Sequence, residues 1–288
     1  MKLAYLGSPQ VAVNPLKALV ADGHEVALVV SQPDRKRGRG GNLLPSPVKA
    51  AALELGLTVS DRVDDVIDVG AELGVVVAFG RLIKPHVLSA LPMVNLHFSL
   101  LPRWRGAAPV ERAILAGDTT TGVCLMALEE GLDTGPVYAR AETPIDSEDT
   151  ADQLRSRLEG LGTAMLLQAL LEGLPEPEPQ VGEPTYAAKL APGEHELDWG
   201  RPAIHLHRVI RLGRAWTTFR GKRLKVLLAR LVDGPVTLAP GAIDPVTLQV
   251  GAGEGAVELV EVQPEGKPVQ EASAWRNGAH LIAGDRLG

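Results

Sequence analysis

The sequence predicts an α/β protein in which a doubly wound, mainly parallel sheet is followed by a small β-barrel. Three observations predict this architecture. Short continuous apolar runs alternate with segments of helical periodicity over the first 170 residues, which is typical of strands buried on both faces of a parallel sheet. A proline-rich stretch, Glu172–Pro184, then interrupts the alternation. The remaining chain holds one short helical pattern and several β runs separated by Gly/Pro turns, which favours a small antiparallel barrel or sandwich.

The elements of the first part follow in a regular order. Continuous apolar runs predict strands at Leu3–Leu6, Val26–Val30, Val75–Phe79 and Met93–Leu96, with two more at Gly122–Ala127 and Gly135–Ala141. Helical periodicity predicts helices at Asn14–Val20, Val48–Leu55, Lys84–Ala90, Ala108–Ala116 and Thr150–Leu171. Before the second helix, Ser46-Pro47 has the pattern of an N-cap with proline at the first helical position. Such sheets bind ligands beyond the carboxyl ends of their strands.

The second part begins with a helical pattern at Pro202–Leu212. The β runs after it are Leu224–Leu231, Thr247–Val250, Val257–Val262 and His280–Ile282. We therefore expect three segments in the chain: a sheet domain of residues 1–185, a linker of residues 186–200, and an OB-like β-barrel domain of residues 201–288.

Composition excludes several classes of protein. No apolar run reaches the roughly 18 residues that a membrane-spanning helix needs, and the N-terminus lacks the long apolar region of a signal peptide. Cys124 is the only cysteine, which excludes intrachain disulfides and thiolate metal clusters. We expect a globular, cytoplasmic protein with no membrane partner.

Charge is distributed unevenly along a chain whose net charge is -6. Residues 201–230 hold nine Lys and Arg and no acid, and residues 31–49 hold five against one acid. In the helical pattern, Arg208, Arg211 and Arg214 fall opposite the apolar residues when each residue turns by about 100°. Charge runs often serve only to keep a surface solvated. The complete absence of acids from residues 201–230 favours an exposed basic strip with a polyanion partner.

Three common kinds of site are not indicated. Gly7-Ser8-Pro9-Gln10, after the first predicted strand, does not form the G-x-G-x-x-G fingerprint of dinucleotide binding, and the sequence has no Walker loop. His205 and His207 are the closest histidine pair, but that spacing on a helix points their rings about 200° apart. We therefore expect neither an NAD-dependent dehydrogenase, nor a P-loop NTPase, nor a metal site.

A polar pair at the end of a buried strand is the strongest local signal. Asn95 and His97 share one face of the predicted strand, and buried polar groups are costly unless they are hydrogen-bonded or used. A capping Asn and a hydrogen-bonded core His would explain an isolated pair equally well. Asp133, in the glycine-bracketed loop Glu130–Gly135, adds a carboxylate, although an ordinary turn would also use Asp there. Together, an amide donor, an imidazole and a carboxylate indicate acid–base chemistry.

Several distant segments of the chain resemble, in the same order, the folate-dependent formyltransferase family. Two of them are N-L-H-F-S-L-L-P-R-W-R-G-A-A-P-V, which begins at Asn95, and T-G-V-C-L-M-A-L-E-E-G-L-D-T-G-P-V, which ends at Val137. Residues 32–49 resemble the inserted loop of the tRNA-directed members, and residues 185–199 resemble the passage into their C-terminal domain. The resemblance implies a Rossmann-like formyltransferase catalytic domain in residues 1–185 and a tRNA-binding domain in residues 201–288. It also implies a bacterial, cytoplasmic enzyme, which we expect to be a monomer.

The resemblance also assigns residues to roles. The family's catalytic trio falls on Asn95, His97 and Asp133. The folate-contacting motif falls on Ser99, Leu100, Leu101 and Pro102. We expect tRNA contacts from Arg35, Lys36, Arg37, Arg39, Arg208, Arg211, Arg214, Lys222 and Arg223. Two departures from the family's pattern, Arg81 and Phe98, are expected to reshape the folate pocket.

The implied reaction transfers the formyl group of 10-formyltetrahydrofolate to the α-amino group of methionine esterified to initiator tRNA, for translation initiation. In that reaction Asn95 would donate a hydrogen bond to the oxyanion, and His97 would stabilise the same charge or carry a proton towards folate N10. Asp133 would hold the imidazole and accept the proton of the amine. No metal or redox cofactor is needed. Three alternatives remain open: a formyltetrahydrofolate hydrolase, a formyltransferase acting on a small amine, and a non-catalytic tRNA-binding protein.

Overall fold

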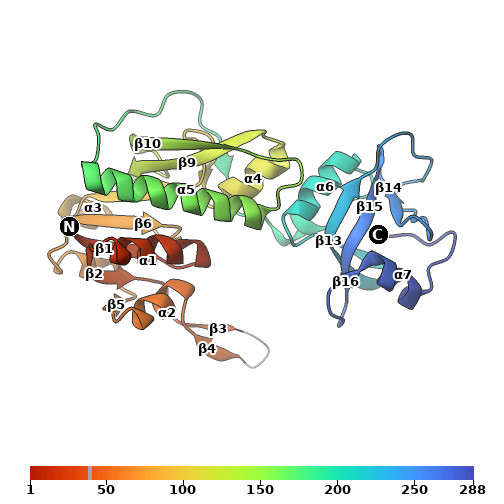
Figure 1. The fold of residues 1–288 in the computed structure, drawn as a ribbon, viewed down its shortest axis with the longest axis horizontal. Helices are drawn as coiled ribbons and strands as arrows, with labels where there is room; N and C mark the ends of the chain where they lie inside the picture. The colour runs from red at the N-terminus through yellow and green to blue at the C-terminus, as the bar shows by residue number, and fades with distance from the viewer. Residues whose placement is uncertain (38–40) are drawn as a thin grey trace. The chain divides into compact units, whose positions relative to one another are not determined.

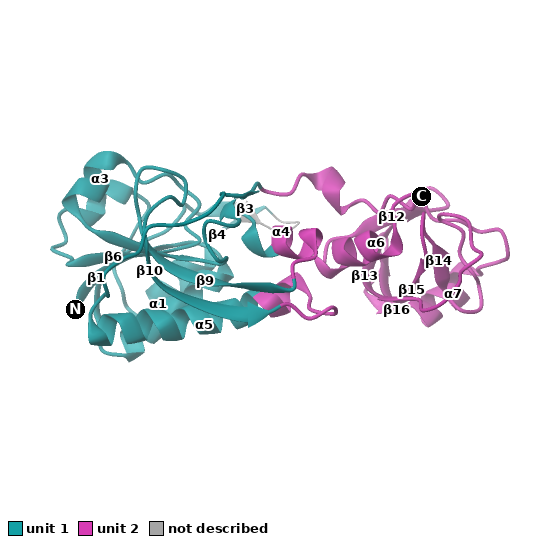
Figure 2. Ribbon diagram, turned by 90° about the horizontal axis from the view of Figure 1, so that it is seen from above, with its two compact units in different colours: residues 1–110, 119–144, 155–188 teal, residues 111–118, 145–154, 189–288 magenta. Residues whose placement is uncertain are grey.

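The computed structural model describes residues 1–37 and 41–288, in two compact units that are coloured separately in Figure 2. Unit 1 comprises residues 1–110, 119–144 and 155–188. Unit 2 comprises residues 111–118, 145–154 and 189–288. Figure 1 labels most of the helices and strands. Within the described residues, no helix is both long enough and apolar enough to span a membrane.

Unit 1 is built on a seven-stranded sheet with the strand order β10-β9-β7-β6-β1-β2-β5. Its strands are β1 (Lys2–Gly7), β2 (Glu25–Val30), β5 (Val59–Ser60), β6 (Leu73–Val77), β7 (Met93–His97), β9 (Thr120–Ala127) and β10 (Val137–Pro144). Neighbours from β5 to β7 pair in parallel, whereas β9 and β10 add an antiparallel edge. All residues of β6 and β7 are buried, as expected for strands covered on both faces. The predicted mainly parallel sheet is confirmed.

The helices of the first 172 residues begin and end close to the predicted positions. The helices in the first 172 residues are α1 (Val13–Ala21), α2 (Pro47–Glu54), α3 (Pro85–Ala90), α4 (Pro109–Ala116) and α5 (Ala151–Glu172), with two 3₁₀ turns, η1 (Gln10–Ala12) and η2 (Val63–Val66). The predicted start of α2 is confirmed, because the Ser46 hydroxyl accepts a hydrogen bond from the Lys49 N–H at 3.0 Å and Pro47 opens the helix.

The long helix α5 covers one face of β7 and leaves the opposite face for the polar side chains. A Cβ added to Gly162 of α5 would lie 3.1 Å from Val123 and 3.5 Å from Leu96. The helix therefore packs closely on the face of the sheet that carries Leu96 and Val123, and it crosses that face in Figure 1. Since side chains alternate along a strand, Asn95 and His97 point to the opposite face.

A short antiparallel hairpin follows β2. Its strands are β3 (Arg35–Arg37) and β4 (Asn42–Leu44). Two contacts hold its base to the start of α2: Ser31 and Ser46 hydrogen-bond through their hydroxyls at 2.6 Å, and Lys49 Nζ lies 2.7 Å from Asp34 Oδ1. Both ends of the hairpin are thus fixed to the carboxyl edge of the sheet.

The C-terminal residues of unit 2 form a curled, five-stranded antiparallel sheet, which confirms the predicted small β domain. The strand order is β12-β13-β15-β14, with β16 beside β15. The elements are η3 (Pro192–His195), α6 (Ala203–Arg211), β12 (Trp216–Phe219), β13 (Lys222–Leu231), β14 (Gln249–Gly251), β15 (Ala256–Pro264), β16 (Gln270–Glu271) and α7 (Ala272–Ala279). Helix α6 buries Leu206, Val209 and Ile210 in the core of this unit, as its periodicity predicted.

One predicted strand of the second part is wrong. His280–Ile282 does not pair with a strand but follows α7, a helix that the sequence did not predict. His280 ends α7 in the left-handed conformation, with φ 49°, and the Ile282 side chain is exposed. Two adjacent apolar residues are too short a run to distinguish a strand from a helix end. Trp275 anchors α7 because its buried ring contacts Phe219 edge to face, with 5.1 Å between the ring centroids.

Candidate active site

The site begins with two polar residues on the face of β7 that points away from α5. Asn95 and His97 are 8% and 5% exposed, and they lie opposite Met126 and Cys124 of β9. Among the described residues the Asn95 carboxamide has no hydrogen-bond partner. Neither Oδ1 nor Nδ2 of Asn95 is among the fully buried, unpaired polar atoms of the described residues, so the amide reaches the surface and keeps its donors for a ligand.

The imidazole of His97 is held from both sides. Its Nε2 lies 2.8 Å from the carbonyl oxygen of Trp104, and because a carbonyl can only accept, Nε2 carries a proton. Its Nδ1 lies 3.6 Å from Asp133 Oδ2. The same carboxylate oxygen accepts a hydrogen bond from the Gly106 N–H at 2.7 Å. The structure thus brings the two distant motifs together, and Nδ1 is the nitrogen that faces the carboxylate.

Two residues beside this pair have an unusual backbone. Trp104 has φ 60° and Asp133 has φ 50°, in the left-handed region that costs a non-glycine residue about 1–2 kcal/mol. Such conformations persist only where the surroundings hold them, and they concentrate at functional sites. The Trp104 conformation lies next to the carbonyl that fixes His97, and the Asp133 conformation aims the carboxylate at the ring.

The predicted folate motif is divided between interior and surface. Ser99 is fully buried, and its hydroxyl donates to the Arg103 carbonyl at 2.6 Å. Leu101 packs in a small apolar cluster with Cys124, and burial raises the pKa of that thiol. Leu100 and Pro102 are half-buried. Ser99 and Leu101 therefore shape the loop from inside, and Leu100 and Pro102 are the members that a ligand can reach.

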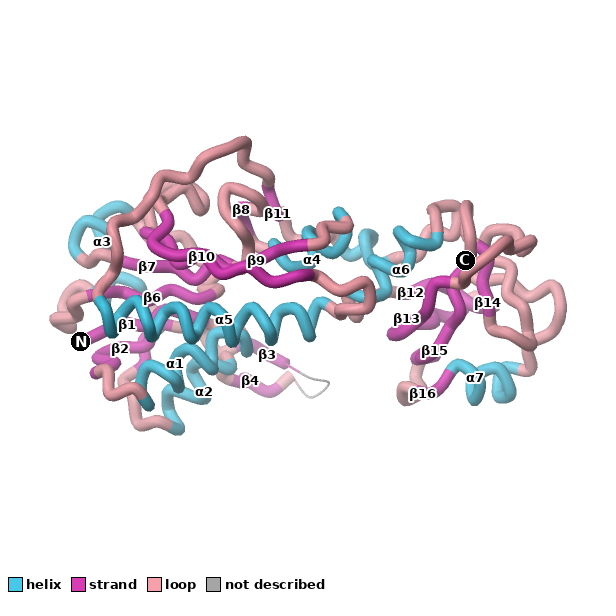
Figure 3. The backbone as a smooth tube through the Cα atoms, turned by 45° about the horizontal axis from the view of Figure 1, so that its top comes forward, coloured by secondary structure: helices cyan, strands magenta, loops and turns pink. Residues whose placement is uncertain are grey.

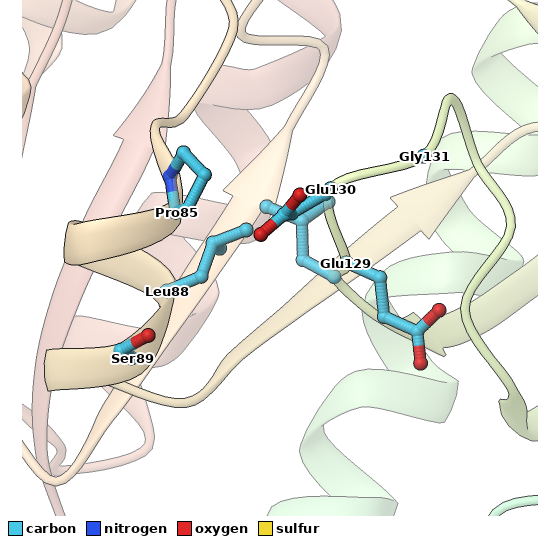
Figure 4. A pocket seen from close by; sticks show the side chains of 7 residues that line it. Pro85, Leu88, Ser89, Glu129, Glu130 and Gly131 are labelled. Carbon is cyan, nitrogen blue, oxygen red and sulfur yellow. The ribbon is translucent and has the colours of Figure 1, made fainter.

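A pocket of about 400 Å³ opens between α3 and the loop that leads to Asp133. Its lining residues are Pro85, Leu88, Ser89, Leu128, Glu129, Glu130 and Gly131. Figure 4 shows the α3 side chains facing the loop across this pocket. Of the two departures noted in the sequence, Phe98 is buried, while the Arg81 guanidinium donates to the Asp61 carbonyl at 2.6 Å.

The predicted basic residues are found in different surroundings. Arg35 is exposed at the start of β3, Lys36 and Arg37 also lie on β3, and Arg39 lies outside the described residues. In unit 2, Arg214, Lys222 and Arg223 are exposed, and the Arg223 guanidinium lies 4.2 Å from the centroid of the Trp216 ring. Arg208 is half-buried against Gly117.

For Arg211, the expected exposure is wrong. The residue is 8% exposed, and its guanidinium donates to the carbonyls of Asp149 and Asp146 at 2.6 and 2.8 Å. The helical periodicity correctly predicted that Arg211 lies on the side of α6 opposite its buried apolar residues. The sequence could not reveal that residues 145–154 belong to the same unit and cover that side of the helix.

Sequence reasoning also missed groups that act through the backbone. The Trp104 carbonyl and the Gly106 N–H orient His97 and Asp133, yet any residue type supplies such groups. No side-chain pattern could have located them.

Among the described residues, no cluster of three or more His, Cys, Asp or Glu is placed to hold a metal ion.

An amide, an imidazole and a carboxylate gathered at the carboxyl edge of a parallel sheet form the arrangement expected of an acid–base site on a doubly wound fold. The chain belongs to the formyl transferase family: residues 1–170 match the family model "Formyl transferase", and residues 189–280 match "Formyl transferase, C-terminal domain". This confirms the resemblance that the motifs indicated.

Individual relatives are similar along the whole chain. The methionyl-tRNA formyltransferase of Ruegeria pomeroyi is 43% identical and that of a Jannaschia species is 46% identical, and each alignment covers 100% of both chains. Among solved structures, the fold is similar to the N-formyltransferase of Helicobacter canadensis in complex with folinic acid and dTDP-3-aminofucose. That match has a TM-score of 0.69 and 18% identity, and it covers 92% of this chain and 99% of the other.

Proposed function

We propose that this protein transfers the formyl group of 10-formyltetrahydrofolate to the α-amino group of methionine esterified to initiator tRNA. The observation that carries the proposal is that the buried Asn95 and His97 share one face of β7 while the half-buried Asp133 carboxylate lies 3.6 Å from His97 Nδ1. Full-length similarity to two methionyl-tRNA formyltransferases supports the same pair of substrates. All three catalytic groups come from one chain, and we propose that the enzyme acts as a monomer in the bacterial cytoplasm.

The chemistry of formyl transfer matches the three side chains. A neutral amine attacks the formyl carbon, so negative charge develops on oxygen and positive charge on the attacking nitrogen. Asn95 donates to the oxyanion, and losing such a donor costs about 10²–10³ in rate. Asp133 accepts the proton of the attacking nitrogen, and His97, whose Nδ1 faces Asp133, stabilises the developing negative charge. The proton taken up by Asp133 is then given to N10 as it departs. The chain's groups thus move one proton from the nucleophile to the leaving group.

The pocket between α3 and the loop that leads to Asp133 supports folate binding there. In this open pocket, Leu88 and Leu128 provide apolar surface and Glu129 and Glu130 provide polar groups. Bound in this pocket, the folate would present its formyl group to the amine. Within the predicted folate motif, we propose that Leu100 and Pro102 contact the folate, because Ser99 and Leu101 are turned into the interior.

Two basic regions support a tRNA partner. The exposed cations Arg214, Lys222 and Arg223 belong to the C-terminal domain of residues 201–288, which we propose binds tRNA phosphates. Arg35, Lys36 and Arg37 form the first strand of the hairpin after β2, and we propose that they contact the acceptor end together with Arg39. Arg211 has no part in this proposal, because its guanidinium is buried.

One assay tests the function against its alternatives. The protein is incubated with 10-formyltetrahydrofolate and, in separate arms, with methionyl-initiator tRNA, a small primary amine, or no acceptor, and the products are identified by mass spectrometry. We expect N-formylmethionyl-tRNA as the main product. Tetrahydrofolate with formate would indicate a hydrolase, and a formylated small amine would indicate a different acceptor. Binding of tRNA without formation of any product would indicate a non-catalytic tRNA-binding protein.

A further inference from the structure

The proline-rich segment after α5 is held against unit 1 by specific contacts. We call residues 173–187 the strap; most of it is drawn as loop in Figure 3, where it runs from the end of α5 to β11 (Tyr186–Ala187). At Glu178 it forms a bridge with Val137 of β10, with N···O distances of 2.7 and 2.9 Å. At its end, β11 pairs in parallel with β8 (Arg105–Gly106). The proline-rich segment is thus attached to unit 1 at Glu178 and again at its C-terminal end.

Between these attachments, Gln180 joins the two loops that carry the catalytic groups. Its Nε2 donates to the carbonyls of Asp133 and Gly135, both at 2.8 Å. Its Oε1 accepts from Arg105 Nε at 3.1 Å and Nη2 at 2.6 Å. Both donor hydrogens and both acceptor positions of the carboxamide are therefore used. One side chain connects the backbone of Asp133 to the loop that contains Trp104 and Gly106.

Thr185 makes a second connection to the same loop. Its Oγ1 accepts from the Trp104 N–H at 2.9 Å, and its carbonyl accepts from the Arg105 N–H at 2.8 Å. Trp104 and Asp133 are the residues of these loops with a left-handed, non-glycine backbone. The strap thus binds a peptide group at each of the two strained positions, one through Thr185 and the other through Gln180.

We propose that Gln180 and Thr185 are positioning residues for formyl transfer. Thr185 holds the Trp104 backbone, whose carbonyl accepts from His97 Nε2, and Gln180 holds the Asp133 backbone, whose carboxylate faces His97 Nδ1. The strap thereby sets the distance between imidazole and carboxylate while touching neither. This inference rests on the proposed function of the same trio.

The first test compares two strap residues that differ in what they hold. Gln180→Ala removes the link between the loops. Glu178→Ala, two residues away, removes only an exposed ion pair with Arg140, 3.2 Å long. We expect Gln180→Ala to lower kcat by about 10- to 100-fold, because misplacement of a catalytic group by about 1 Å costs that much, with KM for both substrates within about twofold. Glu178→Ala is expected to keep wild-type kcat.

A further substitution separates the two halves of the Gln180 contact. Gln180→Glu keeps an acceptor for Arg105 but loses the donors to the carbonyls of Asp133 and Gly135. We expect its kcat to be as low as that of Gln180→Ala. Wild-type activity in Gln180→Glu would mean that only the Arg105 contact matters, which contradicts the proposal.

The second test uses the hydroxyl of Thr185. Thr185→Val removes the acceptor of the Trp104 N–H at nearly constant volume, whereas Thr185→Ser keeps it. We expect a loss of kcat in Thr185→Val and recovery in Thr185→Ser, with thermal unfolding measured for every variant. Equal kcat in the Val and Ser variants, or in Gln180→Ala and Glu178→Ala, would overturn the proposal, as would losses that follow the unfolding temperature alone. Failure of the wild-type protein to form N-formylmethionyl-tRNA would instead refute the proposed function.

Discussion

The proposed catalytic trio of unit 1 and the basic residues of unit 2 differ in how their neighbours fix their contacts. His97 is buried, and each of its ring nitrogens faces one oxygen. Arg214 and Lys222 are exposed, so they remain available to any phosphate. Arg211, from the same basic run, is buried and bound to two carbonyls. The comparison teaches that charge in the sequence predicts a partner only where the side chain remains exposed, whereas a buried polar group has its partners fixed by the fold.

The largest effect is expected when one side chain of the trio is removed. His97→Ala removes the group between the Trp104 carbonyl and Asp133, and we expect kcat to fall by about 10²–10⁴-fold, as for other acid–base groups. Affinity for tRNA should stay within about twofold, because the cations proposed to bind phosphate are untouched. Steady-state formylation and a tRNA-binding titration check both values. Loss of tRNA affinity in His97→Ala would show that the site and the basic surface are not separate.

The next effect concerns Arg211, whose buried guanidinium we expect to stabilise unit 2 rather than bind tRNA. Arg211→Ala removes two hydrogen bonds from a charged donor, each of a kind worth about 1.5–3 kcal/mol. We expect the free energy of unfolding to fall by at least that amount. Urea unfolding followed by tryptophan fluorescence suits the test, since Trp199, Trp216 and Trp275 all lie in unit 2. The slope of log K against log salt for tRNA binding should not change. A reduced slope would mean that Arg211 neutralises a tRNA phosphate after all.

A smaller effect is expected from single exposed cations. Lys222→Ala and Arg223→Ala should each weaken tRNA binding while leaving kcat unchanged. The slope of log K against log salt should decrease by about 0.7–0.9 for each phosphate that the variant no longer neutralises. Lys267→Ala is the matched control, because Lys267 is exposed in unit 2 but lies outside the basic run. Equal slopes for wild type, Lys222→Ala and Lys267→Ala would contradict a phosphate role for Lys222.

The smallest effect is a pH dependence of stability at α6. Burial lowers the pKa of His207, Arg211 lowers it further, and Glu148 at 3.4 Å acts in the opposite direction. Because the pKa is lower in the folded state, the unfolded chain binds more protons below about pH 6.5, and stability falls as the pH drops through that region. One proton contributes at most about 1.4 kcal/mol per pH unit. Urea unfolding between pH 7.5 and 5.5 should show a shallower slope in His207→Gln than in wild type.

Much of the candidate site could be predicted because it depends on local sequence. Alternation along β7 placed Asn95 and His97 on one face, and the loop after β9 brought Asp133 towards them. The sheet itself followed from apolar runs that are buried on both sides. These features need only the period of a strand and the order of the elements.

The remaining features depend on contacts between distant segments that have no local signal. The burial of Arg211 required knowing that residues 145–154 join unit 2. The attachment of the strap depends on one glutamine carboxamide and one threonine hydroxyl within a stretch whose prolines indicated only irregular structure. Helix α7 was missed because a single large apolar residue, Trp275, anchors it.

The central claim is that Asn95, His97 and Asp133 act together in formyl transfer, and Asp133→Asn tests it most directly. The substitution keeps the shape of the side chain and an oxygen for the Gly106 N–H, but it removes the negative charge that faces His97 Nδ1. The measurement is single-turnover formylation of methionyl-initiator tRNA at saturating concentrations of both substrates. We predict a rate at least about 100-fold below wild type. A rate within about threefold of wild type would contradict the account.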